Sequence, residues 1–178
     1  EALYGVQTLR GIENFSISKF RLSEYPLFIK GLAITKMAAA MANFELGLLT
    51  VEQKDAIIAA CGEIIDGKHH DQFPVDMIQG GAGTTTNMNA NEVIANRALE
   101  LMGHERGEYQ YCSPNDHVNC SQSTNDAYPT AIHIGMYFKH LQLLPHLEEL
   151  IASFRKKGEE FSRIIKMGRT QLEDAVPM

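Results

Sequence analysis

Three clusters of polar residues contain the side chains best suited to chemistry, and each lies beside the end of a predicted helix. They are "GGAGTTTNMNANE" (80–92), "NCSQSTND" (119–126) and "GRTQLED" (168–174). All three offer neutral hydroxyl and amide groups in place of a nucleophile paired with a base. The unpaired N–H groups and the dipole at a helix start attract an anion. Together the clusters favour binding of a small dianionic acid and stabilisation of negative charge that develops on it.

Each cluster taken alone also has a structural interpretation. A residue of the run 123–126 could simply cap the following helix, because the first N–H groups of a helix lack partners. The glycines of the first cluster allow tight turns, and Arg169 in the third could belong to a solvated turn. The first cluster matches neither G-x-G-x-x-G nor the phosphate-binding lysine loop, so nucleotide binding is not supported.

The elements around these clusters are predicted to be helical, which gives a mainly α fold class. Apolar residues at helical spacing predict helices over residues 26–46, 50–67, 91–102 and 126–166. Thr50 and Gln53 fit a capping box at the start of the second helix. Pro145 is expected to bend or interrupt the last helix. The opening thirty residues are predicted to be an arm with little regular structure, and 74–79 is the only strand candidate.

The last predicted helix is too long to pack within one small domain. About 40 residues at 1.5 Å each reach about 60 Å, and its apolar positions are expected to face other long helices. We therefore assign residues 1–122 to an N-terminal helical domain with its opening arm. Residues 123–178 are the incomplete beginning of a long-helix domain. The chain has no initiator Met and no closing element, so we expect a longer protein.

Composition argues against several classes of function. The formal net charge is −6, whereas a nucleic-acid surface needs clustered Lys and Arg. No uncharged apolar run approaches the roughly 20 residues of a membrane span. Three cysteines without paired spacing suit a reducing cytoplasm. The histidines are scattered and no C-x-x-C occurs, so no metal site is predicted.

Beyond these patterns, the sequence resembles the aspartase/fumarase superfamily. The resemblance is carried by "GGAGTTTNMNANEV", "SPNDHVNCSQSTNDAYPTA" and "GRTQLEDAVPM", and it extends through "LYGVQTLRGIENFSIS", "DQFPVDMIQGG" and "ELMGHERGEYQY". It covers essentially the whole chain in order. It implies a mostly helical, three-domain subunit in a homotetramer built around a long-helix bundle, with each active site shared by three subunits.

The ammonia-lyase branch of this superfamily is the most similar, and it implies a reaction. Ammonia is removed reversibly from L-aspartate to give fumarate. A base takes the proton next to the side-chain carboxylate, which becomes an aci-carboxylate dianion. No cofactor is implied, and activation by a divalent metal is left open.

Matching motif to motif assigns substrate-binding roles to seven residues. The resemblance implies that the side-chain carboxylate is held by Thr84, Ser123 and Thr124. Asn125 would contact the amino group, Thr170 the α-carboxylate and Gln171 the leaving amine, while Asn87 would shape the pocket. The family's base is a Ser on a flexible Gly-Ser-Ser loop, followed by a Lys and an Asn, and it is expected beyond Met178. Neither His117 nor His133 receives that role, so the 178-residue chain alone is predicted to be inactive.

Two alternatives remain open at this stage. Fumarate hydratase shares the fold and the dianion mechanism but eliminates water; hydratases of the superfamily generally carry His where Gln171 stands. A non-catalytic helical assembly module is the second alternative. An intact Gly-Ser-Ser loop in the full reading frame would favour the enzyme.

Overall fold

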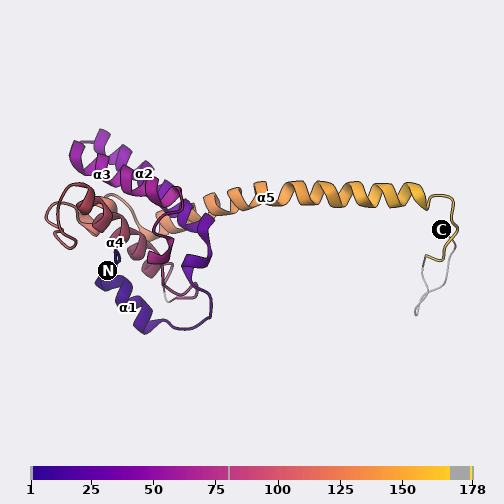
Figure 1. The fold of residues 1–178 in the computed structure, drawn as a ribbon, viewed down its shortest axis with the longest axis horizontal. Coiled ribbons are helices and arrows are strands. Elements are labelled where there is room, and N and C mark those ends of the chain that lie inside the picture. The colour runs from indigo at the N-terminus through magenta and orange to yellow at the C-terminus, as the bar shows by residue number, and fades with distance from the viewer. Residues whose placement is uncertain (1, 80, 169–176, 178) are drawn as a thin grey trace. The chain divides into compact units, whose positions relative to one another are not determined.

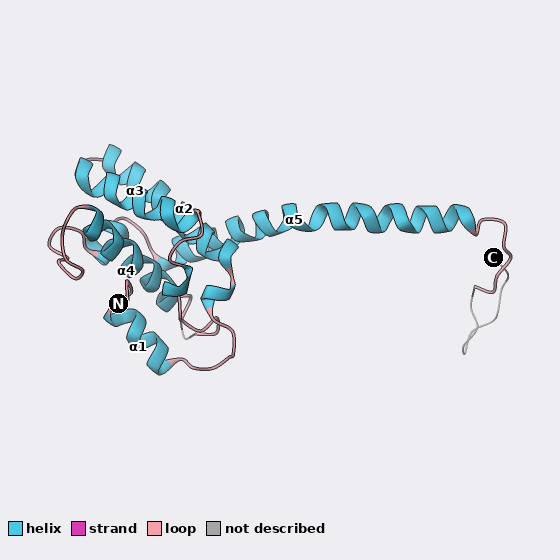
Figure 2. Cartoon of the chain, in the orientation of Figure 1, coloured by secondary structure: helices cyan, strands magenta, loops and turns pink. Residues whose placement is uncertain are grey.

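The structure is a computed structural model that describes residues 2–79, 81–168 and 177. Its α-helices are α1 (Val6–Asn14), α2 (Pro26–Glu45), α3 (Val51–Ile65), α4 (Thr84–Leu101) and α5 (Thr124–Glu160) (Figure 2). A π-helical turn, Pro114–Val118, lies in the loop before α5. The described residues form isolated bridges but no strand, so residues 74–79 are not a strand. The mainly α prediction is confirmed.

The chain divides into two compact units, Glu1–Lys139 and His140–Met178. The predicted domain boundary between residues 122 and 123 stays a prediction for the complete protein. In the first unit, α2 packs against α3, α3 against α4, and α1 against α4 (Figure 1). Apolar residues at helical spacing form the core between them, including Ile29, Leu32, Ile57, Ile64 and Ile94.

Helix α2 is a core helix, although its length and mean hydropathy of 1.3 would also suit a membrane span. Of its residues, Ile29 and Leu32 are fully buried in the apolar core. Lys36 is fully buried as well, and its ammonium group finds polar partners inside the unit. Helix α3, which covers α2, begins with the predicted capping box: Thr50 accepts from Gln53 N, and the Gln53 side chain accepts from Thr50 N.

The prediction of an irregular opening arm is wrong, because residues 6–14 form α1. No side chain in α1 caps its own start. Instead, the Glu92 carboxylate of α4 accepts hydrogen bonds from the backbone N–H groups of Gly5, Gln7 and Thr8, at 2.9–3.0 Å. A residue more than eighty positions away therefore supplies the cap that the local sequence lacks.

Helix α4 also begins earlier than predicted, at Thr84 and not near Asn91. The Gln79 amide accepts from Thr86 N at 2.9 Å and donates to the Thr86 hydroxyl, which caps the first turn. Farther along, Asn89 is buried and donates to the Gln72 carbonyl at 2.9 Å. These long-range partners offset the low helix propensity of Thr and Asn.

Helix α5 continues from Thr124 to Glu160, so Pro145 does not interrupt it, and the alternative of a bend at Pro145 stays a prediction. Proline removes one backbone donor, and the helix continues on both sides of that position. Within the first unit, α5 docks closely on α2, because a Cβ added to Gly31 would overlap the Ala131 carbonyl oxygen. The second unit contains the rest of α5, whose apolar side chains are exposed at Leu143, Leu147, Leu150, Ile151 and Phe154.

A candidate active site at the starts of two helices

Ser123 caps α5, so the structural interpretation of this residue is correct. Its Oγ accepts from Asn125 N at 3.1 Å, and the Asp126 carboxylate accepts from Ser123 N at 3.1 Å. A hydroxyl carries one proton and two acceptor lone pairs. Capping uses one lone pair of the Ser123 hydroxyl, and the hydroxyl can still donate its proton to another group.

The Asp126 carboxylate weakens the attraction of the α5 N-terminus for an anion. Its negative charge lies in the first turn of α5, where it offsets part of the positive end of the helix dipole. An anion bound here must therefore rely on hydroxyl and amide donors more than on the dipole. The side chains of Ser123 and Asn125 are exposed and available for this.

Thr124 and Asn87 bring the first two clusters together. Asn87 on α4 donates through Nδ2 to Thr124 Oγ1 at 3.3 Å. Asn87 is buried, and its Oδ1 has no hydrogen-bond partner within the described part of the chain. Thr84 is exposed one turn earlier on α4, so it lies on the face that Asn87 presents. The buried Oδ1 atoms of Asn89 and Asn91 on the same helix are also unpaired within the described residues, so this feature alone does not mark a binding site.

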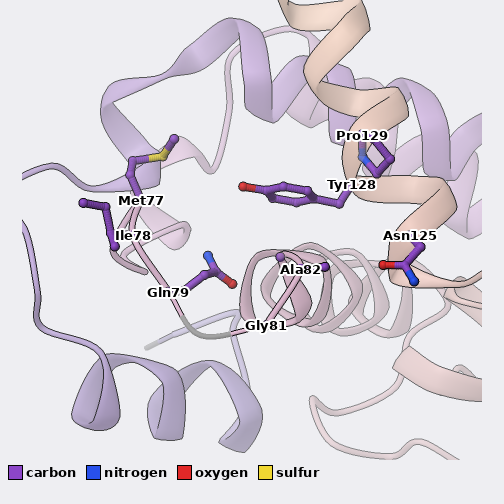
Figure 3. Close-up of a pocket in the computed structure, with 9 residues that line it drawn as sticks. Met77, Ile78, Gln79, Gly81, Ala82, Asn125, Tyr128 and Pro129 are labelled. Atoms are coloured by element: carbon purple, nitrogen blue, oxygen red, sulfur yellow. The ribbon is translucent and has the colours of Figure 1, made fainter.

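A pocket of about 430 Å³ lies beside this junction, lined by residues 77–79, residues 81–83 and the start of α5 (Figure 3). Figure 3 shows the Tyr128 ring lying between Met77 and Pro129, with the Gln79 amide below it. Gly83 has φ +88°, and a Cβ there would overlap the Tyr128 ring, so only glycine fits. Burial raises the pKa of Tyr128 above its ordinary value of 10.0, so its hydroxyl stays neutral.

Three residues behind the junction were not assigned a role from the sequence. Lys36 is fully buried, and its Nζ donates to Asn119 Oδ1 and to Gln122 Oε1, both at 2.9 Å. Burial lowers the pKa of Lys36 to about 7. A lysine inside the apolar run of α2 was a usable signal, because a lysine is almost never fully buried without partners. Asn119 and Gln122 belong to the polar run 119–126, but nothing in the sequence distinguished them from their neighbours there.

The third cluster cannot be placed beside the other two. Thr170 and Gln171 lie outside the described residues, so their predicted contacts with the α-carboxylate and the leaving amine stay predictions. The structure brings together Thr124 with Asn87 and places Ser123 and Asn125 directly beside Thr124.

The sequence that forms this site matches a known family over its whole length. The family described as Lyase matches residues 1–178, and the chain belongs to it. Aspartate ammonia-lyase of Helicobacter pylori strain J99 is 60% identical over 178 residues, which are 100% of this chain and 38% of that protein. The Pseudomonas canavaninivorans protein of the same name is 61% identical with the same coverage.

Solved structures agree with this family. A Brucella melitensis structure described as fumarate lyase:delta crystallin bound to cobalt superposes with a TM-score of 0.93 at 54% identity, covering 100% of this chain and 39% of that one. Recombinant class II fumarase from Schistosoma mansoni gives 0.86 at 40% identity, covering 100% and 37%. The chain thus spans well under half the length of the relatives it matches.

Proposed function

We propose that the complete protein is an ammonia-lyase that converts L-aspartate reversibly to fumarate and ammonia, and that this chain is its N-terminal part. The observation that carries the proposal is identity over the whole chain. It is 60–61% with the two aspartate ammonia-lyases above and 40% with the class II fumarase. The motifs of the candidate site lie inside this continuous match.

The geometry supports a receptor for a carboxylate that gains charge. Ser123 and Thr124 each accept a hydrogen bond from this chain, so each has its hydroxyl proton left to donate. Hydrogen bonds from neutral donors that are held in place become stronger as charge develops on the substrate, and the donors need little reorientation during the reaction. The aci-carboxylate dianion of an ammonia-lyase is a species of that kind.

The proposed site combines described residues with groups that lie outside them. We assign the side-chain carboxylate to Thr84, Ser123 and Thr124, and the amino group to Asn125. Thr170 and Gln171 would serve the α-carboxylate and the leaving amine, and the serine base would come from beyond Met178. The exposed apolar residues of α5 in the second unit suit burial in a homotetramer whose subunits share each site.

Assay of the complete protein with L-aspartate and with L-malate tests this proposal, with fumarate absorbance as the readout. We expect fumarate from aspartate and little or none from malate. Turnover of malate without aspartate would replace the proposal with fumarate hydratase, which the likeness to class II fumarase favours as the second candidate. Turnover of neither, by a folded oligomer, would favour the non-catalytic assembly module.

A further inference from the structure

A chain of side-chain hydrogen bonds links the buried lysine to the proposed carboxylate receptor. Lys36 Nζ donates to Asn119 Oδ1 at 2.9 Å. Asn87 Nδ2 donates to the same oxygen at 3.1 Å and to Thr124 Oγ1 at 3.3 Å. The chain therefore crosses from α2 through the loop before α5 to α4, and ends at a hydroxyl of α5.

The direction of each bond in this chain is fixed by groups that can act in only one way. The oxygen and nitrogen of an amide are told apart by their partners. Asn119 Nδ2 donates to the Gln122 backbone carbonyl at 3.0 Å, and a carbonyl only accepts. Asn119 must therefore present its Oδ1 to Lys36 Nζ, which donates to it.

The orientation of Asn119 determines that of Asn87. Because Asn119 presents an acceptor, Asn87 must present its NH₂ group, and the same NH₂ group reaches Thr124. Thr124 Oγ1 is consequently an acceptor toward the protein. Its own proton has to point elsewhere.

The acceptor that a threonine inside a helix commonly uses, the carbonyl four residues earlier, does not serve Thr124. Thr124 is the first residue of α5, so the Cys120 carbonyl four residues earlier belongs to the preceding loop. That oxygen accepts from Asn43 Nδ2 at 2.9 Å and from Gln122 Nε2 at 3.1 Å. Among the residues that the structure describes, no acceptor takes the Thr124 proton.

We propose that Lys36, Asn119 and Asn87 are positioning residues that fix the Thr124 hydroxyl as a donor directed out of the protein toward the substrate carboxylate. This inference rests on the proposed function, because it names how one donor of that site is oriented. The Thr124 hydroxyl is already directed toward the substrate carboxylate before the transition state forms, so no reorientation is required when charge develops.

The isosteric change Asn87→Asp in the complete protein tests the direction of the relay. It replaces the donor with an acceptor, so the Thr124 proton turns inward to the introduced carboxylate. We expect kcat/KM to fall by about 10²-fold or more, mostly in kcat, as for loss of one oxyanion donor.

Asn89→Asp is the matched control for that experiment. Asn89 is equally buried on the same helix, and its Nδ2 donates to the Gln72 carbonyl at 2.9 Å with no link to Thr124. Its folded fraction should keep kcat/KM within about twofold of wild type. Equal losses of kcat/KM in the two folded variants would overturn the proposal.

A double-mutant cycle keeps the test available if Asn87→Asp fails to fold. Asn87→Ala, Thr124→Val and the double variant are compared by kcat/KM. If Asn87 acts through Thr124, the double variant loses no more than Thr124→Val alone; losses that multiply would overturn the relay. The cycle can be run with malate if aspartate is not turned over, so failure of the relay is distinguishable from failure of the proposed function.

Discussion

The starts of α4 and α5 have similar compositions, but after the exposed Thr84 the polar side chains of α4 are mostly buried. Both are rich in hydroxyl and amide side chains. At α4, Thr86, Asn87 and Asn89 are buried, whereas Ser123 and Asn125 at α5 are exposed. The first group holds the fold together and orients its neighbours, and the second is free to meet a ligand.

The difference shows that composition alone does not separate a structural cluster from a binding cluster. What separates them is burial. The Thr86 hydroxyl accepts from the Gln79 amide and is buried, and that amide fixes the first turn of α4. The Thr124 hydroxyl also accepts from inside the first unit, but Thr124 is only half-buried and lies between the exposed Ser123 and Asn125.

Thr124→Val in the complete protein should give the largest effect on activity. Valine keeps the shape but removes the outward donor, so we expect kcat/KM to fall by about 10²–10³-fold. Steady-state kinetics with aspartate measures the loss. Thr130→Val, at an exposed position on the same helix, is the control and should leave kcat/KM unchanged. Equal activity of the two variants would contradict the assignment of Thr124.

The next predicted effect is on stability, and it comes from the close packing of α5 on α2. Gly31→Ala places a Cβ against the Ala131 carbonyl oxygen, and backbone cannot move aside cheaply. We expect the free energy of unfolding to fall by about 1–3 kcal/mol, as for an overpacked core. Urea unfolding followed by circular dichroism measures it.

Gly62→Ala on α3 is the matched control for Gly31→Ala. A Cβ there meets nothing within 4 Å, so the change should stabilise the helix by about 0.5–1 kcal/mol. A gain in stability from both substitutions would show that α5 does not approach α2 as closely as described.

Thr86→Val sharpens the comparison with Thr124→Val, because the same substitution is made at the other helix start. It removes the acceptor for Gln79 and should lower the free energy of unfolding by about 1 kcal/mol. The folded fraction should retain its kcat/KM. A loss of kcat/KM as large as that of Thr124→Val, with stability unchanged, would reverse the roles given to the two clusters.

A separate predicted effect is a pH dependence of stability from Lys36. Burial lowers the pKa of Lys36 from 10.5 to about 7 in the folded chain. The unfolded chain therefore binds more protons between about pH 7 and pH 10, and the contribution of Lys36 to the free energy of unfolding rises across that window. The Cys61 thiol beside it stays neutral there, because burial raises its pKa to about 12.

Lys36→Met removes this contribution. The difference in free energy of unfolding between wild type and Lys36→Met, measured by urea unfolding at several pH values, should increase from about pH 7 to about pH 10. Parallel curves over that range would show that Lys36 is not held in a desolvated site.

Local patterns predicted the elements whose signals lie within their own sequence. The apolar spacing of α2 and α3 and the Thr50 capping box were predicted correctly because neighbours along the chain supply them. The start of α1 was missed because its cap is Glu92, and the first turns of α4 were missed because Gln79 and Gln72 satisfy their polar side chains. Such long-range partners leave no local signal.

The candidate site shows the same division. Ser123 and Thr124 were predicted from motif and helix position, and the structure places Thr124 against Asn87. The orientation of that bond could not be predicted, since it depends on Lys36 and Asn119 meeting across two elements. The sequence motif identifies the donor side chains, whereas tertiary packing sets the direction of their hydrogen bonds.

A crystal structure of the complete protein with succinate bound would test the central claim most directly. We predict one succinate carboxylate within about 3 Å of the hydroxyl oxygens of Ser123, Thr124 and Thr84. Succinate bound away from the start of α5, with the Thr124 hydroxyl donating to a protein group, would contradict it.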